Sequence, residues 1–229
     1  MAASSSFKEI QDRVLDLISK SDATTRNRIK NWINMGYHDF MLREVWPFRE
    51  ATGTLNLVAG TQEYDLSTFF SDIDEQNITS VTLQGAQQTK LVYWPFQQLR
   101  ANQPDFDAEG SAVPTRYYIK SGKIGFWPVP AGTYEVFIDY YSVPTELSND
   151  SDTPSIPVAY RESLVHYALS LEHDFNTDPD LAQKAMNRYE QIVTLARNNL
   201  LAQPTDTETF RILGPADSKS WTGLSGEIR

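Results

Sequence analysis

Histidine and carboxylate side chains are the groups in this sequence best suited to metal or acid–base chemistry. His166 and His173 lie seven residues apart, with Glu162 one turn before them. Residues at this spacing lie nearly on one helix face, where two imidazoles and a carboxylate could hold a zinc ion. Helical metal sites use closer histidine pairs, and Tyr167 and Leu171 separate these two. We therefore predict a hydrogen-bonded helix surface and no metal, with a metal hydrolase as an alternative.

Two neighbouring pairs, His38-Asp39 and His173-Asp174, have the residue types of an acid–base couple. Adjacent helical residues point in different directions, so neither pair is arranged to act on one substrate atom. The sequence also contains no glycine-rich loop for a phosphate and no nucleophile elbow. We expect a protein that is not an enzyme and has no cofactor.

Two acidic stretches imitate part of a calcium-binding loop. They are Asp72-x-Asp74-x-Gln76 and Asn149-Asp150-x-Asp152. A complete loop also contains a central glycine and a distal glutamate, which both stretches lack. We predict a turn at each position.

Composition and charge limit the possible functions further. The chain has 229 residues, no cysteine and a net charge of −10, which excludes disulfides and thiol chemistry. Residues 51–157 hold 5 basic and 13 acidic side chains, a net charge of −8. A nucleic-acid binding site needs clustered lysine and arginine, so we expect none in this region. The acidic excess can also be explained by solubility alone. We also expect no signal peptide and no membrane span, since MAASSSFKEI and the rest of the chain lack the necessary apolar run.

Hydrophobic periodicity predicts two helices before residue 50. Ser6 and Glu9 form a capping box, and apolar residues follow at helical spacing: Phe7, Ile10, Val14, Leu17 and Ile18. Ser21-Asp22 interrupts the chain and caps a second helix, which is predicted over residues 23–44. Its apolar face holds Ile29, Trp32, Ile33, Gly36, Tyr37 and Phe40, and its exposed face holds Arg26, Arg28, Lys30 and Arg43.

From Ala51 the hydrophobic period changes to two, which is typical of strands. Residues 54–58 and 62–66 flank a short turn and predict a hairpin. A second pair is predicted at 77–84 and 89–94, and three further strands at 117–119, 123–127 and 133–141. In the last strand Tyr134, Val136, Ile138 and Tyr140 share the predicted core side. Residues 103–112 are polar and are predicted to form an exposed loop.

Helices return after a polar turn at residues 148–153. Pro157 is predicted to begin the third helix, and Asp178 to cap the fourth with Pro179 in its first position. The predicted apolar residues are Leu164, Tyr167, Ala168, Leu171 and Phe175 in the third helix, and Leu181, Ala185, Tyr189, Ile192, Ala196 and Leu200 in the fourth. The sequence thus predicts an α+β protein: a four-helix core from 1–50 and 158–201, with a β-rich insertion at 51–157.

The last residues, 202–229, show no periodicity but are too apolar for a solvated tail. Their apolar side chains are Phe210, Ile212, Leu213, Trp221 and Leu224. We expect an extended C-terminal arm that orders on a partner; a frayed tail is the alternative.

Aromatic residues are numerous in the β-rich part. They are Trp94, Phe96, Tyr117, Tyr118, Phe126, Trp127, Tyr134, Phe137, Tyr140 and Tyr141. We interpret them as sheet core and subunit contacts. The alternative is a carbohydrate- or peptide-binding accessory module that uses exposed rings of this set.

One stretch also carries a resemblance to a known family. From Pro114 onward the chain has Tyr-Tyr-Ile, Gly-x-Ile, Trp-Pro-x-Pro, Tyr-x-Val and Tyr-Tyr-x-x-Pro-x-x-Leu, followed by an aspartate-rich turn, Ile-Pro and an amphipathic helix. Together with the earlier Val-Ala-Gly-Thr-Gln-Glu-Tyr-Asp-Leu at 58–66, this order resembles the head-to-tail adaptor (connector) proteins of tailed bacteriophages. The resemblance runs from about Phe7 to Leu200.

The resemblance implies a structural virion protein at the junction of capsid and tail, assembled in the bacterial host cytoplasm. It implies a homo-oligomeric ring of twelve copies docked beneath the portal protein, with the C-terminal arm along the portal. The arm's anchors would be Phe210, Ile212, Leu213, Trp221 and Leu224. The next tail component, a nozzle or tail terminator, would be a further partner. Double-stranded DNA would pass through the ring without specific binding.

Overall fold

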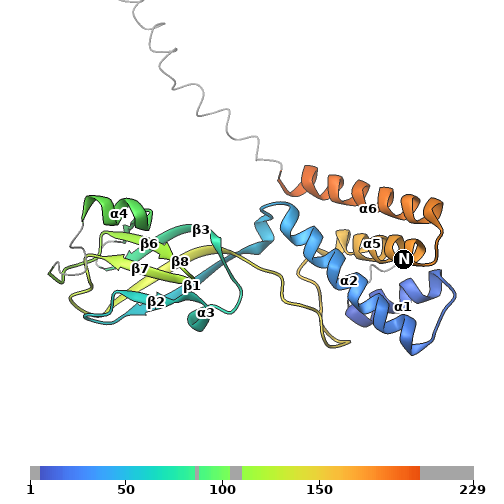
Figure 1. Ribbon diagram of the computed structural model, residues 1–229, viewed down its shortest axis with the longest axis horizontal. Helices are drawn as coiled ribbons and strands as arrows, with labels where there is room; N and C mark the ends of the chain where they lie inside the picture. The colour runs from blue at the N-terminus through green and yellow to red at the C-terminus, as the bar shows by residue number, and fades with distance from the viewer. Residues whose placement is uncertain (1–5, 86–87, 104–109, 202–229) are drawn as a thin grey trace, which may run out of the picture.

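The computed structural model describes residues 6–85, 88–103 and 110–201. It has two lobes, joined by a connection that includes residues 44–49, which we call the neck (Figure 1). One lobe is helical and is built from both ends of the described chain. The other is a β sandwich formed by the middle of the chain. The α+β class is confirmed, and the four long helices share one core.

The helical lobe consists of α1 (Phe7–Leu17), α2 (Ala23–Arg43), α5 (Glu162–Phe175) and α6 (Pro179–Leu200). Their ends are fixed by the residues that the sequence indicates. Ser6 and Glu9 form the capping box of α1, and the Asp22 carboxylate accepts from the Thr25 amide at the start of α2 (2.8 Å). Asp178 caps α6 in the same way, with Pro179 at its first position.

The predicted apolar stripes are partly wrong, because three of their residues lie in the end turns of α1, α5 and α6 and are left uncovered. Leu17, Phe175 and Leu181 are 58%, 59% and 41% exposed. Several buried positions of the same helices were missed; they include Leu15, Leu169 and Val193. The third helix also begins later than predicted. Pro157 precedes a 3-10 turn, Val158–Tyr160, and α5 starts at Glu162.

The β lobe contains two four-stranded sheets. The first has the order β1-β8-β3-β4 and the second β2-β7-β6-β5. The strands are β1 (Glu50–Leu57), β2 (Glu63–Asp65), β3 (Ile73–Gln84), β4 (Thr89–Lys90), β5 (Val92–Tyr93), β6 (Arg116–Lys120), β7 (Lys123–Trp127) and β8 (Tyr134–Ser142). Short helices α3 (Leu66–Phe69) and α4 (Phe96–Asn102) and a 3-10 turn, Pro47–Arg49, complete the described elements.

The predicted hairpin at 54–58 and 62–66 is wrong. β1 pairs with β8 and β2 pairs with β7, so the turn between β1 and β2 carries the chain from one sheet to the other. The second predicted pair is correct only for β3 with β4, because β5 crosses over to pair with β6. Local turn signals identified these strands but could not identify partners that lie far away in the sequence.

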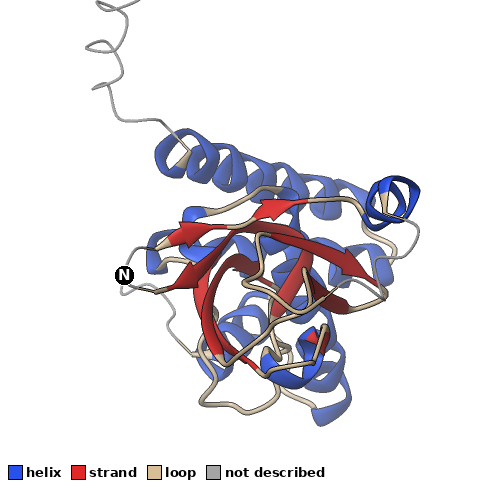
Figure 2. Ribbon diagram, turned by 90° about the vertical axis from the view of Figure 1, so that its left-hand side faces the viewer, coloured by secondary structure: helices blue, strands red, loops and turns tan. Residues whose placement is uncertain are grey.

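The two sheets bury one apolar core between them, and the strands curve around it (Figure 2). In β8, Val136, Ile138 and Tyr140 are buried, as their alternation predicts. Glu135, Phe137 and Asp139 therefore belong to the outer side of the first sheet. This assignment of the two sides becomes important for the surface charges.

Candidate binding surfaces

Arg49 lies in the neck and ties the two lobes together. Its side chain, 3% exposed, donates to the Met41 carbonyl of α2 (2.9 Å), the Ser142 carbonyl of β8 (2.7 Å) and the Asp74 carboxylate of β3 (3.3 Å). A guanidinium suits this position because its donors point in several fixed directions. The sequence gives little signal for this role, since the three acceptors include two backbone carbonyls.

Trp46 packs on the helical side of the same neck. Its indole is fully buried, stacks between Phe40 and Phe48, and donates to the Phe40 carbonyl (2.7 Å). The indole thereby caps a carbonyl in the last turn of α2. Together with Arg49, it fixes the direction in which the chain leaves the helical lobe for β1.

Glu172 is a charged residue that the sequence analysis missed. Its side chain is fully buried in the helical lobe and receives two hydrogen bonds from Arg28 (2.8 and 2.7 Å). Lys20 lies 3.3 Å away, and Asn176 also donates. Burial raises the pKa of this carboxyl, but the hydrogen bonds from Arg28 and Asn176 outweigh burial and lower it to about 2. The group is therefore a structural anion that joins α2 to α5.

The sequence-predicted metal candidates do not come together as a site. The distance from His166 Nε2 to Glu162 Oε1 is 3.9 Å, and Glu162 also pairs with Arg13 (2.8 Å). Burial lowers the pKa of His166. Within the described residues, no group of three or more histidine, aspartate or glutamate side chains is arranged to hold a metal ion.

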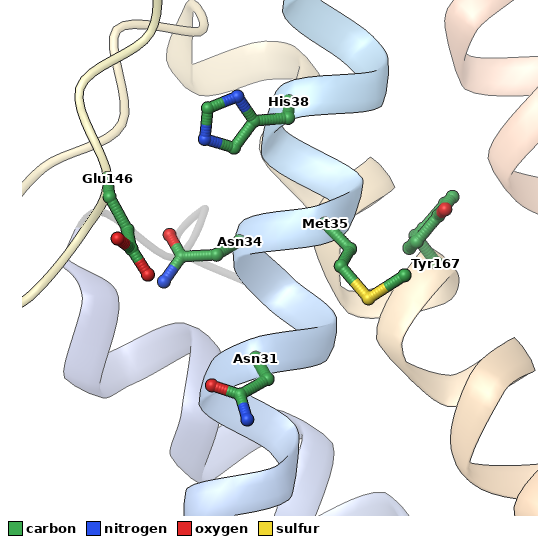
Figure 3. Close-up of a pocket in the computed structure, with 6 residues that line it drawn as sticks. All are labelled: Asn31, Asn34, Met35, His38, Glu146 and Tyr167. Atoms are coloured by element: carbon green, nitrogen blue, oxygen red, sulfur yellow. The ribbon is translucent and has the colours of Figure 1, made fainter.

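His38 and Asp39 point to different environments, as expected of helical neighbours. Asp39 accepts from Arg43 (2.8 Å) and from the Tyr189 hydroxyl, which connects α2 to α6. His38 instead lines an open depression of about 520 Å³ along α2 (Figure 3). Its other lining residues are Asn31, Asn34, Met35, Glu146 and Tyr167.

This depression is bordered by the connecting segment 143–157, which runs from β8 back to the helices. Asn34 holds that segment through two hydrogen bonds with the Leu147 backbone, both 3.0 Å. Asn34 and Glu146 lie on one side of α2, whereas Met35 and Tyr167 lie on the other (Figure 3). The lining side chains thus do not converge on one point, and the geometry fits a contact surface better than a reaction site.

The calcium-loop imitation at residues 149–152 is a turn, as predicted, whereas the prediction of a turn at residues 72–76 is wrong because Asp74 and Gln76 lie in β3. In both stretches carboxylates are occupied by protein donors. Asp74 accepts from the Gln76 amide and from Asn77, besides its contact with Arg49. Asp152 accepts from the Ser148 and Asn149 amides (2.8 and 2.7 Å).

The aromatic residues divide into core and surface. Tyr117, Tyr118, Phe126 and Tyr140 are buried, in agreement with the core interpretation. Trp94, Phe96 and Trp127 are half-buried around Leu99 and Tyr118 on the outer side of the second sheet. Arg116 covers two of these rings, lying 4.1 Å from the Trp94 centroid and 5.1 Å from that of Trp127.

The predicted arm residues, Phe210, Ile212, Leu213, Trp221 and Leu224, lie outside the described residues. Among the helices that are described, none has the length and apolar character needed to cross a membrane.

A helical bundle interrupted by a β sandwich, with a buried neck between them, defines the architecture of this α+β chain. The sequence matches the family model for the SU10 adaptor protein over residues 5–215. The chain belongs to this family of phage head–tail adaptors and is thus a virion component. A comparison with curated proteins found no match.

Proposed function

We propose that this adaptor forms a ring of twelve copies beneath the portal, joins the capsid vertex to the tail and leaves a conduit for DNA. The observation that carries the proposal is the family match, which spans residues 5–215 and makes the chain a phage adaptor. Its role is structural and requires no catalytic group. Assembly takes place in the host cytoplasm.

The proposed division of the chain assigns a task to each part. Residues 1–50 and 158–201 build the wall of the ring, and residues 51–157 project from it toward neighbouring subunits or the next tail component, a nozzle or tail terminator. The buried contacts of Arg49 support this division, because they resist bending between the two lobes. A joint that holds a capsid and a tail in line needs such stiffness.

Residues 202–229 are proposed to extend along the portal. Phe210, Ile212, Leu213, Trp221 and Leu224 are its apolar anchors, of the kind that supplies most of the binding energy at an interface. The arm follows α6, whose last turn lies close to the neck through a contact between Arg197 and Glu44.

An acidic chain suits a DNA conduit. With a net charge of −10, a ring of copies repels phosphates, so DNA passes through without specific binding.

Deletion of residues 202–229 tests the portal contact. We expect the truncated protein to keep its helical circular-dichroism spectrum and lose binding to purified portal rings. As a matched control, Thr205→Ala with Thr207→Ala changes the same arm without removing an apolar anchor and should bind normally. Undiminished portal binding by the truncated protein would contradict the proposed role of the arm.

A further inference from the structure

Ion pairing differs between the two lobes. Ten ion pairs between lysine or arginine and a carboxylate connect described side chains; nine lie in the helical lobe and its connecting segment, and the remaining pair, Arg49 with Asp74, lies at the neck. None of these ion pairs includes Arg116, Lys120, Lys123, Glu50, Glu135 or Asp139. The charges of the β lobe are divided unevenly between its two outer sides.

The outer side of the second sheet carries cations. We call Arg116, Lys120 and Lys123 of β6 and β7 the basic face. Aromatic rings hold two of these cations at the surface: Arg116 lies over Trp94 and Trp127, and the Lys120 ammonium lies 4.3 Å from the Phe96 centroid. Cations over aromatic rings keep their charge available to a partner while their apolar stems are covered.

Two carboxylates share the basic face, and both are occupied by neutral donors. Glu63 accepts from the Tyr118 hydroxyl (3.0 Å), and Asp65 accepts from the backbone and hydroxyl of Ser67. Asp65 also lies in register with Lys123. The three cations of β6 and β7 therefore exceed the two carboxylates of β2, in the same sheet, by one charge.

The outer side of the first sheet carries anions. We call Glu50 of β1 and Glu135 and Asp139 of β8 the acidic face. Asp139 accepts from the Thr52 hydroxyl (2.7 Å) and Glu50 from the Tyr141 hydroxyl (3.1 Å). Lys90 is the one described cation on this sheet, at its edge in the two-residue strand β4.

The two faces lie on opposite sides of one sandwich, because the buried residues of both sheets meet in a single core between them (Figure 2). Charges of opposite sign on opposite sides suit a head-to-tail contact, in which one side of a molecule meets the other side of the next. Half-buried Phe137 lies between Glu135 and Asp139 on the acidic face, and the indoles of Trp94 and Trp127 border the basic face. Each face therefore offers apolar area as well as charge.

We propose that the basic face of one β lobe docks on the acidic face of the β lobe in a second copy of this chain. The inference rests on the proposed ring and specifies which surfaces adjoining subunits use. Charge complementarity selects the register and discourages the contact of like faces. DNA is a poor occupant of the basic face, because three cations beside two carboxylates on a chain of net charge −10 give weak phosphate attraction.

Site-directed crosslinking tests the contact directly, since the natural chain has no cysteine. Full-length Lys120→Cys and Asp139→Cys proteins are mixed and treated with a short bis-maleimide, both in solution and assembled on portal-bearing heads. We expect the mixed dimer to form in roughly tenfold excess over dimers of either variant alone, and to decrease with salt as surface charges are screened. A Lys184→Cys protein, altered on the exposed side of α6, is the control and should give no such preference.

Charge exchange provides a second measurement. Reversal of charge on one face, by Lys123→Glu in both cysteine variants, should reduce cross-face coupling roughly tenfold, equivalent to about 1.4 kcal/mol. Adding Glu135→Lys to the same chains should restore it. Circular dichroism checks that every variant is folded.

The outcomes separate this inference from the proposed function. Adaptors that occupy portal-bearing heads but give no cross-face product there or in solution would overturn the proposed contact and leave the portal role intact. Failure of the natural chain to join heads at all would instead count against the proposed function. A crosslink between the two faces, in solution or on heads, that is lost on reversal of one face and returns when the charges of both faces are exchanged would support the contact.

Discussion

Arg28 of α2 and Glu172 of α5 form a two-point ion pair, at 2.8 and 2.7 Å, and the Glu172 side chain is fully buried. Their positions are 144 residues apart in the sequence, with the whole β lobe between them. The pair therefore fastens the helical segment before the insertion to the one after it. Removal of one partner would leave the other charge uncompensated, which makes this contact a sensitive point of the fold.

Replacement of Glu172 should destabilise the helical lobe strongly. We expect Glu172→Gln to lower the free energy of unfolding by about 3 kcal/mol, because Arg28 loses its buried partner. Urea denaturation at pH 7 measures the change. Glu190→Gln is a matched control, since Glu190 is a 47% exposed partner of Arg43 and its loss should cost no more than about 1 kcal/mol. Equal losses for both variants would contradict the structural role of Glu172.

The carboxyl group of Glu172 also predicts how the free energy of unfolding depends on pH. The pKa of Glu172 is lowered from 4.5 to about 2, so the unfolded chain binds the proton first as pH decreases. Its contribution is present above about pH 4.5 and is lost as pH falls toward 2. The wild type should therefore lose more stability between pH 5 and pH 2.5 than Glu172→Gln loses, by about 2 kcal/mol. Parallel stability curves for the two proteins would show that Glu172 is not responsible.

The sequence predicted the helical lobe better than the β lobe, and the reason is the range of the signals. Helix periodicity and the caps Ser6, Asp22 and Asp178 are local, and they located α1, α2 and α6 closely. Strand pairing is not local. β8 lies between β1 and β3, so the hairpin expected from the turn at residues 59–61 could not reveal either partner.

Charged residues were harder to interpret from the sequence than apolar ones. Arg28 was predicted to be exposed, although it pairs with buried Glu172. Nothing in the local pattern around Glu172 distinguishes it from a solvated helix residue, because its partner is distant. An acidic residue next to predicted apolar Leu171 was the only hint. The charge separation of the β lobe likewise required knowledge of which strands share a sheet.

Gly36 should be intolerant of a side chain. A Cβ at this position in α2 would lie 2.8 Å from Cγ of Tyr167, at the base of the ring where it cannot swing away. Overpacking should outweigh the roughly 1 kcal/mol that alanine adds to a helix, so we expect Gly36→Ala to destabilise the protein by about 1 to 2 kcal/mol net. Gly132→Ala is the control, because its Cβ would be 3.7 Å from the nearest atom. A more stable Gly36→Ala protein would show that the two helices can separate.

Trp127 should stabilise the β lobe rather than bind carbohydrate. Arg116 occupies the space over its ring, and its indole nitrogen is buried. We expect Trp127→Ala to lower the free energy of unfolding by about 3 kcal/mol, while wild-type protein shows no glycan binding on an array. Arg116→Ala uncovers the ring without removing it and is the matched variant. Glycan binding by the wild type that disappears in Trp127→Ala would favour the accessory-module alternative.

Arg49 should control how the two lobes move relative to each other. Its three acceptors belong to α2, β3 and β8, so truncation releases contacts with both lobes at once and leaves the Met41 and Ser142 carbonyls without their donor. We expect Arg49→Ala to cost about 3 kcal/mol and to separate thermal unfolding into two transitions, one for each lobe. Small-angle scattering should show a wider range of shapes than for the wild type. Arg49→Lys keeps the charge, but its ammonium cannot reach all three acceptors. The stability of this variant should therefore lie between those of the wild type and Arg49→Ala. A single calorimetric transition for Arg49→Ala, with unchanged scattering, would mean that apolar packing around Trp46 alone suffices to hold the neck.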